Sequence, residues 1–227
     1  MGGTLVNDQS WAEPPLYETL MLARLNEAFG MEHPWFQRLV THPFGESDAP
    51  TWEQHTVKAV AAFLAGEGFD VTEGEVAKIC RACAIPLPEV VELAPGAAET
   101  IRELRRRGVR MVVCSNTLWR NDDDVRRDWE QFGLGDCFAA YVTSHDAGVG
   151  KPHPEIFRRA LAAVGATSSD AAVIGDRPER DLAGARALGM RSIWMRPPDF
   201  RGDPDPPPNE TVDSWLQVIP VIEKWML

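Results

Sequence analysis

The feature that most constrains the fold of this chain is a regular alternation of short apolar runs and amphipathic segments between residues 97 and 196. The apolar runs have the length of buried strands and read VRMVVCSN, FAAYVTS, AAVIGD and RSIWMR. The segments around them have helical spacing and read AAETIRELRRRG, DDDVRRDWEQFGL, PEIFRRALAAVG and PERDLAGARALG. Strands that alternate with helices are joined by crossovers, which favour a parallel sheet with helices on both faces. The sequence therefore predicts an α/β fold.

The segment before this alternation has helical spacing throughout. Helices are predicted at residues 14–30, 51–66 and 73–84, with Thr51 and Thr72 as the N-caps of the second and third. No part of it alternates as a strand does over more than a few residues. We expect an all-helical domain at residues 11–90, inserted into an α/β core made of residues 1–10 and 91–227.

The C-terminal part of the sequence is rich in proline. Six of them fall within residues 197–208, which predicts a loop or an extended stretch. Residues 213–227 follow with amphipathic spacing and predict a terminal helix, interrupted by Pro220.

The overall charge limits the classes of partner. The formal net charge is -11 at pH 7, so nonspecific binding to nucleic acid or to an anionic membrane is disfavoured, because both require a surplus of Lys and Arg on one face. An anionic substrate would need a local cationic pocket. The sequence shows no signal peptide and no apolar run of about 18 residues, and with four cysteines it fits a reducing cytoplasm. Cys80 and Cys83 form a C-x-x-C within helical spacing, which favours helix packing over zinc.

Two acidic residues follow the third apolar run. Asp176 and Asp181 lie in VIGDRPERDLAGARALG, around a strand exit and the start of a helix. Ligands bind at such exits in open α/β sheets, and a carboxylate pair there suits an oxygen-preferring cation such as Mg²⁺. The alternative is a capping box, with Asp176 as the N-cap and Glu179 as its partner.

Two further polar features fall at the ends of predicted strands. Ser115 and Asn116 follow the first apolar run and offer hydrogen-bond donors to an anion, and Lys151 lies in GVGKPHPEIF after the second. Each has a plain alternative, because Ser115 could be an N-cap and Lys151 a surface charge. Together with Asp176 and Asp181, these donors describe a site for a phosphoryl group.

The order of these motifs resembles the haloacid dehalogenase superfamily of hydrolases. It runs GGTL, a helical insert, VVCSNT, GKPHPEIF and IGDRPERDLAGARALGM, as in the branch with a helical cap inserted after the first motif. The resemblance implies a Rossmann-like parallel-sheet core. It also implies a reaction in which an Asp of the first motif attacks phosphorus and water hydrolyses the aspartyl-phosphate, with Mg²⁺ offsetting the charge.

The resemblance also implies roles for particular residues. Ser115 and Asn116 would hydrogen-bond the phosphoryl oxygens, and Lys151 would stabilise the nucleophile and the transition state. Asp176 would ligate Mg²⁺, and Asp181 would ligate or orient it through water. Gly3 and Thr4 match the G-T of the first motif, with Thr4 on the phosphate side and Gly2 in the metal site.

The first motif departs from the family pattern at two places. Aligning its G-T on Gly3 and Thr4 puts the attacking Asp directly before Met1, together with the strand that carries it. We expect the true start of the gene to lie upstream, with an in-frame apolar run ending in that Asp. Gly2 replaces the second Asp of the motif, which usually acts as general acid and base for the leaving group.

Three functions are consistent with this pattern. The first is a Mg²⁺-dependent phosphatase acting on a small phosphorylated metabolite. The second is a non-catalytic binding or regulatory protein on the same scaffold, in which loss of the central strand would leave a gap in the sheet. The third is a metal-free 2-haloacid dehalogenase. The residues that could select the substrate are aromatic or basic side chains of the helical segment and of the loop after Asn116: Trp35, Trp52, His55, Trp119 and Arg120.

Overall fold

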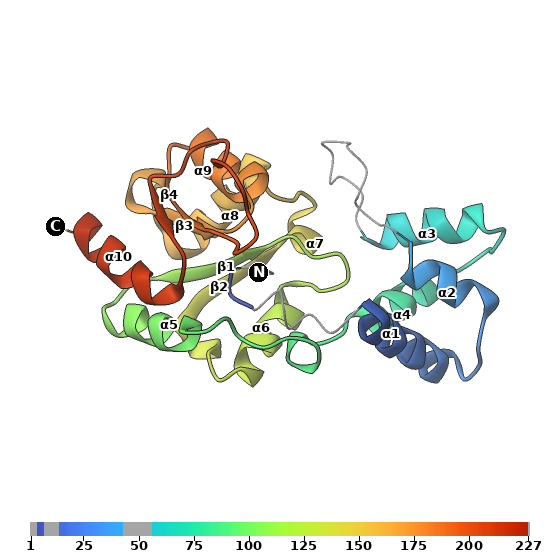
Figure 1. The fold of residues 1–227 in the computed structure, drawn as a ribbon. Helices are drawn as coiled ribbons and strands as arrows, with labels where there is room; N and C mark the ends of the chain where they lie inside the picture. The colour runs from blue at the N-terminus through green and yellow to red at the C-terminus, as the bar shows by residue number, and fades with distance from the viewer. Residues whose placement is uncertain (1–3, 7–13, 43–55, 227) are drawn as a thin grey trace.

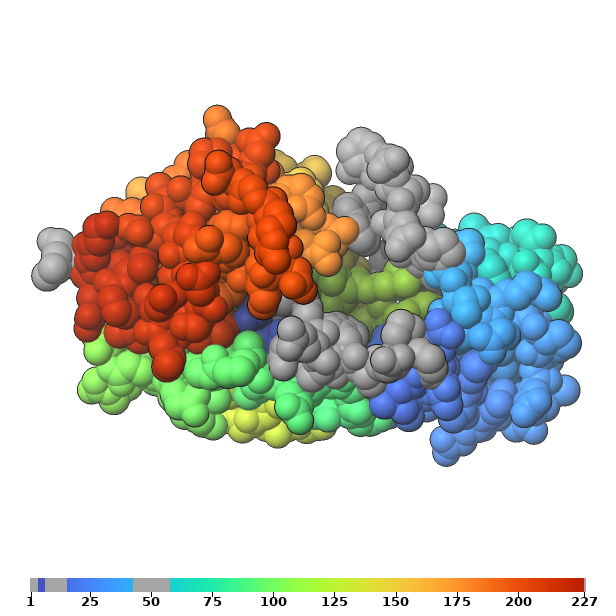
Figure 2. All heavy atoms as spheres, in the orientation of Figure 1, coloured from blue at the N-terminus to red at the C-terminus, as the bar shows by residue number. Residues whose placement is uncertain are grey.

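The protein has two lobes, one all-helical and one α/β (Figure 1). The structure is a computed structural model and describes residues 4–6, 14–42 and 56–226. The helical lobe holds the helices α1 (Pro14–Phe29), α2 (Pro34–Val40), α3 (Thr56–Gly66) and α4 (Glu73–Cys83). In the space-filling view this blue and cyan lobe lies beside the larger mass of the green to red residues (Figure 2).

The helical lobe has a hydrophobic core of its own. Met21, Leu25, Phe36, Leu64 and Ile79, which come from all four helices, are fully buried in it. The described residues between 14 and 88 form no strand, as the spacing predicts. The helix α2 was not predicted, because its seven residues are too few to show a period.

Two local predictions in this lobe fall on α4. Thr72 caps the helix, and its backbone and side chain form a reciprocal capping box with Glu75. Cys80 and Cys83 lie on the same helix and are buried in the lobe's core, so they pack as small apolar side chains. The predicted cap Thr51 lies outside the described residues.

The α/β lobe contains parallel strands in two groups. The strand β1 (Met111–Ser115) pairs with β2 (Phe138–Thr143). The strand β3 (Ala172–Gly175) pairs with β4 (Arg191–Met195), which pairs in turn with β5 (Glu210–Val212). Every one of these pairs is parallel, so the predicted α/β fold is confirmed.

Helices connect and cover these strands. The longer ones are α5 (Ala97–Arg106), α6 (Asp122–Gln131), α8 (Pro154–Val164) and α10 (Val218–Met226), and the shorter ones are α7 (Ser144–Ala147) and α9 (Ala183–Ala187). Single turns of 3-10 or π helix lie at Leu87–Glu89, Gly135–Cys137, Ser168–Asp170, Pro178–Leu182 and Trp215–Gln217. Pro220 lies in the first turn of α10, where proline is tolerated, so the predicted interruption of this helix is wrong.

Alternate side chains of the strands pack on opposite faces. Val113 of β1 belongs to the cluster that contains Leu104 of α5 and Trp129 of α6. Its neighbours Val112 and Cys114 pack against the second cluster, which contains Phe157 of α8. Side chains alternate along a strand, so this arrangement puts helices on both faces of the sheet.

The sheet is divided between β1 and β3. These two strands belong to separate sheets, and a cavity of about 670 Å³ lies between them. Among the described residues, β1 and β3 therefore do not pair with each other.

Two segments cross between the lobes side by side. Val6 forms an antiparallel bridge with Leu93, and the Ala94 backbone N–H donates to the carbonyl of Leu5 over 3.0 Å. The segment 4–6 is thereby fixed next to the chain that returns from the helical lobe. None of the helices that the structure describes is long and apolar enough to cross a membrane.

Candidate functional site

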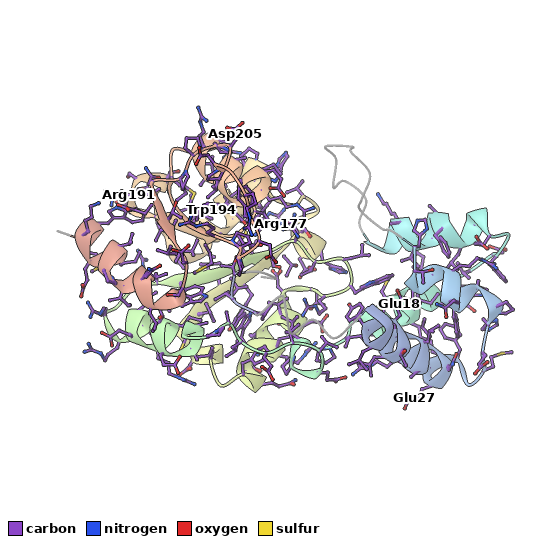
Figure 3. All side chains as sticks on the ribbon, in the orientation of Figure 1. Glu18, Glu27, Arg177, Arg191, Trp194 and Asp205 are labelled. Atoms are coloured by element: carbon purple, nitrogen blue, oxygen red, sulfur yellow. The ribbon has the colours of Figure 1, made fainter. Side chains whose placement is uncertain are left out.

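The polar residues singled out in the sequence meet at one edge of the sheet. Ser115 is the last residue of β1, and Asp176 directly follows β3. Lys151 contacts both Asn116, which follows β1, and Asp181, which follows β3, so the carboxyl ends of the two strands lie side by side. Figure 3 shows the direction of this edge: Arg191 at the start of β4 lies near α10, and Trp194 and then Arg177 lie progressively closer to the helical lobe. The candidate site therefore faces the helical lobe.

A buried ion pair forms the centre of the site. The Lys151 Nζ donates to Asp181 Oδ1 over 2.6 Å, and the two side chains are 11% and 4% exposed. Lysine is almost never buried without a partner. The surface-charge interpretation of Lys151 is therefore wrong.

Asn116 fixes the backbone of Lys151. The Lys151 N–H donates to Asn116 Oδ1 over 2.7 Å, and the Asn116 Nδ2 donates to the carbonyl of Lys151 over 3.0 Å. One N–H of the Asn116 amide remains for another acceptor. The loop after β1 is thus tied to the loop that carries the lysine.

Asp176 is buried and accepts a hydrogen bond from the N-terminal segment. The Thr4 hydroxyl donates to Asp176 Oδ1 over 2.5 Å, and the carbonyl of Thr4 accepts from the Trp215 indole N–H over 2.7 Å. The turn that follows has Arg177 as its N-cap and no side-chain cap. The capping-box alternative for Asp176 and Glu179 is therefore wrong.

Gly175 allows Asp181 to approach the strand. A Cβ at position 175 would lie 2.3 Å from Asp181 Cγ, which is closer than real contacts permit. Asp181 also accepts from the Arg177 backbone N–H over 3.1 Å at Oδ2, while its Oδ1 meets Lys151. Both carboxylate oxygens of Asp181 are therefore held in place.

The charges in the site influence one another. Burial raises the pKa of Asp176 above its ordinary value, and the nearby charge of Asp181 adds to the rise, although the Thr4 hydrogen bond opposes it. Burial acts to lower the pKa of Lys151, but the negative groups around it, Asp181 foremost, outweigh this and raise it. Lys151 is therefore a fixed cation, and Asp176 would gain from a second one.

The described donors fit part of a Mg²⁺ site. Asp176 offers a hard carboxylate oxygen, and a bound cation would offset the cost of burying its charge. Both oxygens of Asp181 already accept hydrogen bonds, from Lys151 and from the Arg177 N–H. Among the residues that the structure describes, no three His, Cys, Asp or Glu side chains are grouped to hold a metal. Asp176 therefore suits a ligand of Mg²⁺, and Asp181 suits a residue that orients the site. Gly2 lies outside the described residues.

Ser115 lies beside these groups and caps no helix. It is 2% exposed, and its hydroxyl makes a long hydrogen bond of 3.4 Å to the carbonyl of Asn116. The next helix, α6, is capped by Asn121. The N-cap alternative for Ser115 is therefore wrong.

Two hydrogen bonds that the sequence did not predict support the loop after Ser115. The Thr117 N–H donates to Ser144 Oγ over 2.9 Å, and Ser144 Oγ donates back to the Thr117 carbonyl over 3.0 Å. The two residues are far apart in the sequence and share no motif. Nothing in the sequence alone could have paired them.

Three of the residues expected to select a substrate make contacts within the fold instead. Trp35 is 4% exposed and packs in the core of the helical lobe, and Trp119 packs against the same core. Arg120 forms a buried ion pair with Asp128 over 2.6 Å. These three side chains have structural contacts, and Trp52 and His55 lie outside the described residues.

Comparison with known families agrees with the fold. A family model described as haloacid dehalogenase-like hydrolase matches residues 1–189 of the 227. The chain belongs to this family. The match contains the described members of the site: Thr4, Ser115, Asn116, Lys151, Asp176 and Asp181.

Curated members of the haloacid dehalogenase-like family resemble part of the chain. A phosphoserine phosphatase of Thermus thermophilus is 37% identical over 117 residues, which cover 50% of this chain and 46% of that protein. A glyceraldehyde 3-phosphate phosphatase of Pyrococcus abyssi is 32% identical over 105 residues, covering 45% of this chain and 42% of that protein. The chain thus spans about half the length of the curated relatives it matches.

Solved structures of the family share the fold over nearly the whole chain. A HAD phosphatase from Thermococcus onnurineus has a TM-score of 0.65 at 19% identity, covering 97% of this chain and 94% of its own. A 2-haloacid dehalogenase from Pseudomonas syringae has a TM-score of 0.64 at 24% identity, covering 98% and 95%. At these identities the likeness concerns the fold alone.

Proposed function

We propose that this protein is a Mg²⁺-dependent phosphatase that removes phosphate from a small phosphorylated metabolite. The observation that carries the proposal is the buried Lys151, paired with Asp181 at the carboxyl edge of the sheet, in a chain whose net charge is -11. A fixed cation in a buried site stabilises negative charge that develops on a phosphoryl group. The relatives named as phosphoserine and glyceraldehyde 3-phosphate phosphatases support phosphate esters as the substrate class.

Each described residue has a proposed part in this reaction. The Lys151 ammonium neutralises charge on the phosphoryl oxygens, and the Ser115 hydroxyl and the second amide N–H of Asn116 donate to them. Thr4 donates its single O–H to Asp176 and so holds that carboxylate in place. Asp176 ligates Mg²⁺, which when bound offsets charge between the attacking carboxylate and the phosphoryl group. Asp181 keeps Lys151 in position.

The proposal also includes an attacking carboxylate, a cap domain and a cellular location. In this proposal the attacking carboxylate is the Asp of the family's first motif, which is not among the described residues. Residues 11–90 act as a cap over a core made of residues 1–10 and 91–227, and the protein works in the cytoplasm.

Phosphate release tests this proposal. The protein, produced with an Asp added directly before Met1, is assayed with p-nitrophenyl phosphate and phosphoserine, with Mg²⁺ and with EDTA. The expected result is turnover that requires Mg²⁺. Halide release from 2-chloropropionate in EDTA would instead identify a dehalogenase, and absence of both activities in folded protein would favour the non-catalytic alternative.

A further inference from the structure

A buried tryptophan holds the main chain of Asp176. The Trp194 indole N–H donates to the carbonyl of Asp176 over 3.1 Å, and Trp194 is 2% exposed. In the register of the sheet, Trp194 of β4 lies opposite Gly175, the last residue of β3, so its ring reaches the first residue after that strand. Because a buried indole N–H needs an acceptor, this bond fixes the side chain and the carbonyl together.

A second tryptophan acts on the side chain of Asp176 through Thr4. The Thr4 hydroxyl donates to Asp176 Oδ1 over 2.5 Å, and the Trp215 indole N–H donates to the carbonyl of Thr4 over 2.7 Å. Thr4, Trp215 and Asp176 are all buried, and hydrogen bonds are stronger where water is excluded. Two indole N–H groups therefore hold the residue, one at its backbone and one by way of the hydroxyl that meets its carboxylate.

This arrangement leaves one oxygen of Asp176 for a cation. Oδ1 accepts from Thr4, whereas Oδ2 lies 3.6 Å from the Arg177 Nε, which is beyond hydrogen-bond distance. The Arg177 side chain is 60% exposed, so it can turn into solvent without leaving a buried charge behind. The direction in which Oδ2 points therefore depends on the hydrogen bonds that hold Asp176.

Aromatic packing fixes the ring of Trp194. The Phe200 ring meets it edge to face with 4.8 Å between the centroids, and the Arg196 guanidinium lies 6.0 Å from its centroid. Phe200 belongs to the proline-rich stretch after β4, so this stretch helps to set the direction of the indole N–H. Trp194, Phe200 and Trp215 all lie beyond residue 189, where the match to the family model ends.

We propose that Trp194 and Trp215 are positioning residues for Asp176 that aim its Oδ2 at Mg²⁺. The inference rests on the proposed function, because it requires Asp176 to be the metal ligand. Removing a group that orients a metal ligand typically weakens metal affinity by roughly 10- to 100-fold. Trp194 contacts Asp176 directly and Trp215 acts through Thr4, so loss of the Trp194 N–H is expected to have the larger effect.

Mg²⁺ binding to the folded protein, measured by isothermal titration calorimetry, tests the proposal without an activity assay. Trp194→Phe removes the indole N–H and keeps an aromatic ring, and Trp215→Phe does the same at the second position. Trp225→Phe is the matched control, because Trp225 lies on α10 beside the Arg191 guanidinium, at the start of β4 and away from the site. The free energy of unfolding of each variant is measured in urea, so that a change in affinity is separated from a change in stability.

Trp194→Phe is expected to raise the dissociation constant for Mg²⁺ by roughly tenfold or more, and Trp215→Phe by a smaller factor, while Trp225→Phe leaves it unchanged. Equal Mg²⁺ affinity in folded Trp194→Phe and in the unmodified protein would overturn the proposal, and so would an equal loss of affinity in the Trp225→Phe control. If Trp194→Phe does not fold, an unchanged affinity in Trp215→Phe overturns it.

The same titration separates this inference from the proposed function. Absence of Mg²⁺ binding to the unmodified protein would overturn the proposed Mg²⁺ site, and the inference with it. Mg²⁺ binding that is lost in Asp176→Asn but unaffected by both tryptophan substitutions would leave the proposed function standing and overturn the inference alone.

Discussion

Two ion pairs are buried to nearly the same degree but lie in different parts of the molecule. Lys151 and Asp181 are 11% and 4% exposed, and Arg120 and Asp128 are 12% and 3% exposed. Each pair has an N–O distance of 2.6 Å. Burial and distance alone therefore do not decide which of the two pairs belongs to a functional site.

The neighbours of the two pairs do distinguish them. Asp128 divides its oxygens between the Arg120 guanidinium and the Leu87 backbone N–H, which donates over 3.0 Å from the segment that leaves the helical lobe. That pair joins elements together. The Lys151 pair lies beside a second carboxylate, Asp176, whose pKa burial raises. An excess of negative charge next to a fixed cation suits binding of a metal and an anion together.

Replacing Lys151 is expected to have the largest effect. Lys151→Met should lower kcat by about 10²- to 10³-fold per folded molecule, because the positive charge at the phosphoryl group is lost. Phosphate release is measured with the folded fraction determined by circular dichroism. A kcat equal to that of the unmodified protein would show that Lys151 has no part in the reaction.

A substitution that displaces Asp181 tests whether its position beside Lys151 matters. Gly175→Ala puts a Cβ 2.3 Å from Asp181 Cγ, so the carboxylate must move away from Lys151. Activity should fall on the order of 10²-fold, with a loss of about 1–3 kcal/mol in the free energy of unfolding. The control is Gly66→Ala, where nothing lies within 4 Å, and both properties should stay nearly unchanged.

Breaking the other buried pair should affect stability rather than chemistry. Arg120→Met leaves Asp128 without its guanidinium and is expected to cost about 3–5 kcal/mol of unfolding free energy in urea titrations. Activity per folded molecule should remain that of the unmodified protein. A selective loss of activity at full stability would give Arg120 a part in the site.

An exposed ion pair is expected to contribute least to the free energy of unfolding. Lys224 Nζ lies 2.6 Å from Glu210 Oε1, but its side chain is 68% exposed. Lys224→Met is expected to change the free energy of unfolding by less than about 1 kcal/mol, because solvent screens such pairs. The same variant is the charge-matched control for Lys151→Met in the activity assay. A large effect of Lys224→Met on activity would show that loss of a positive charge acts nonspecifically.

The regular part of the fold could be predicted from the sequence. The apolar runs and helical segments between residues 97 and 196 coincide with β1 to β4 and their helices, because each is long enough to show its period. The strand β5 has three residues after a proline-rich loop and shows no period at all. It is recognised only by its pairing with β4.

The candidate site could be predicted in part. Motif order brought Ser115, Lys151, Asp176 and Asp181 to one edge of a sheet, but the burial of Lys151 depends on elements far apart in the chain. The pairing of Arg120 with Asp128 was not foreseen either, because one residue lies in a loop and the other on α6. Contacts of this kind are set by tertiary packing and leave no local pattern.

The dependence of phosphate release on Mg²⁺ concentration in an Asp176→Asn variant shows whether Asp176 binds the metal. The control is Glu179→Gln, whose side chain is 60% exposed on the turn that follows Asp176. If Asp176 ligates the metal, the variant should lose activity or require more than about 10-fold more Mg²⁺, while the control is unchanged. A Mg²⁺ requirement that is the same in Asp176→Asn as in the unmodified protein would show that Asp176 is not a metal ligand.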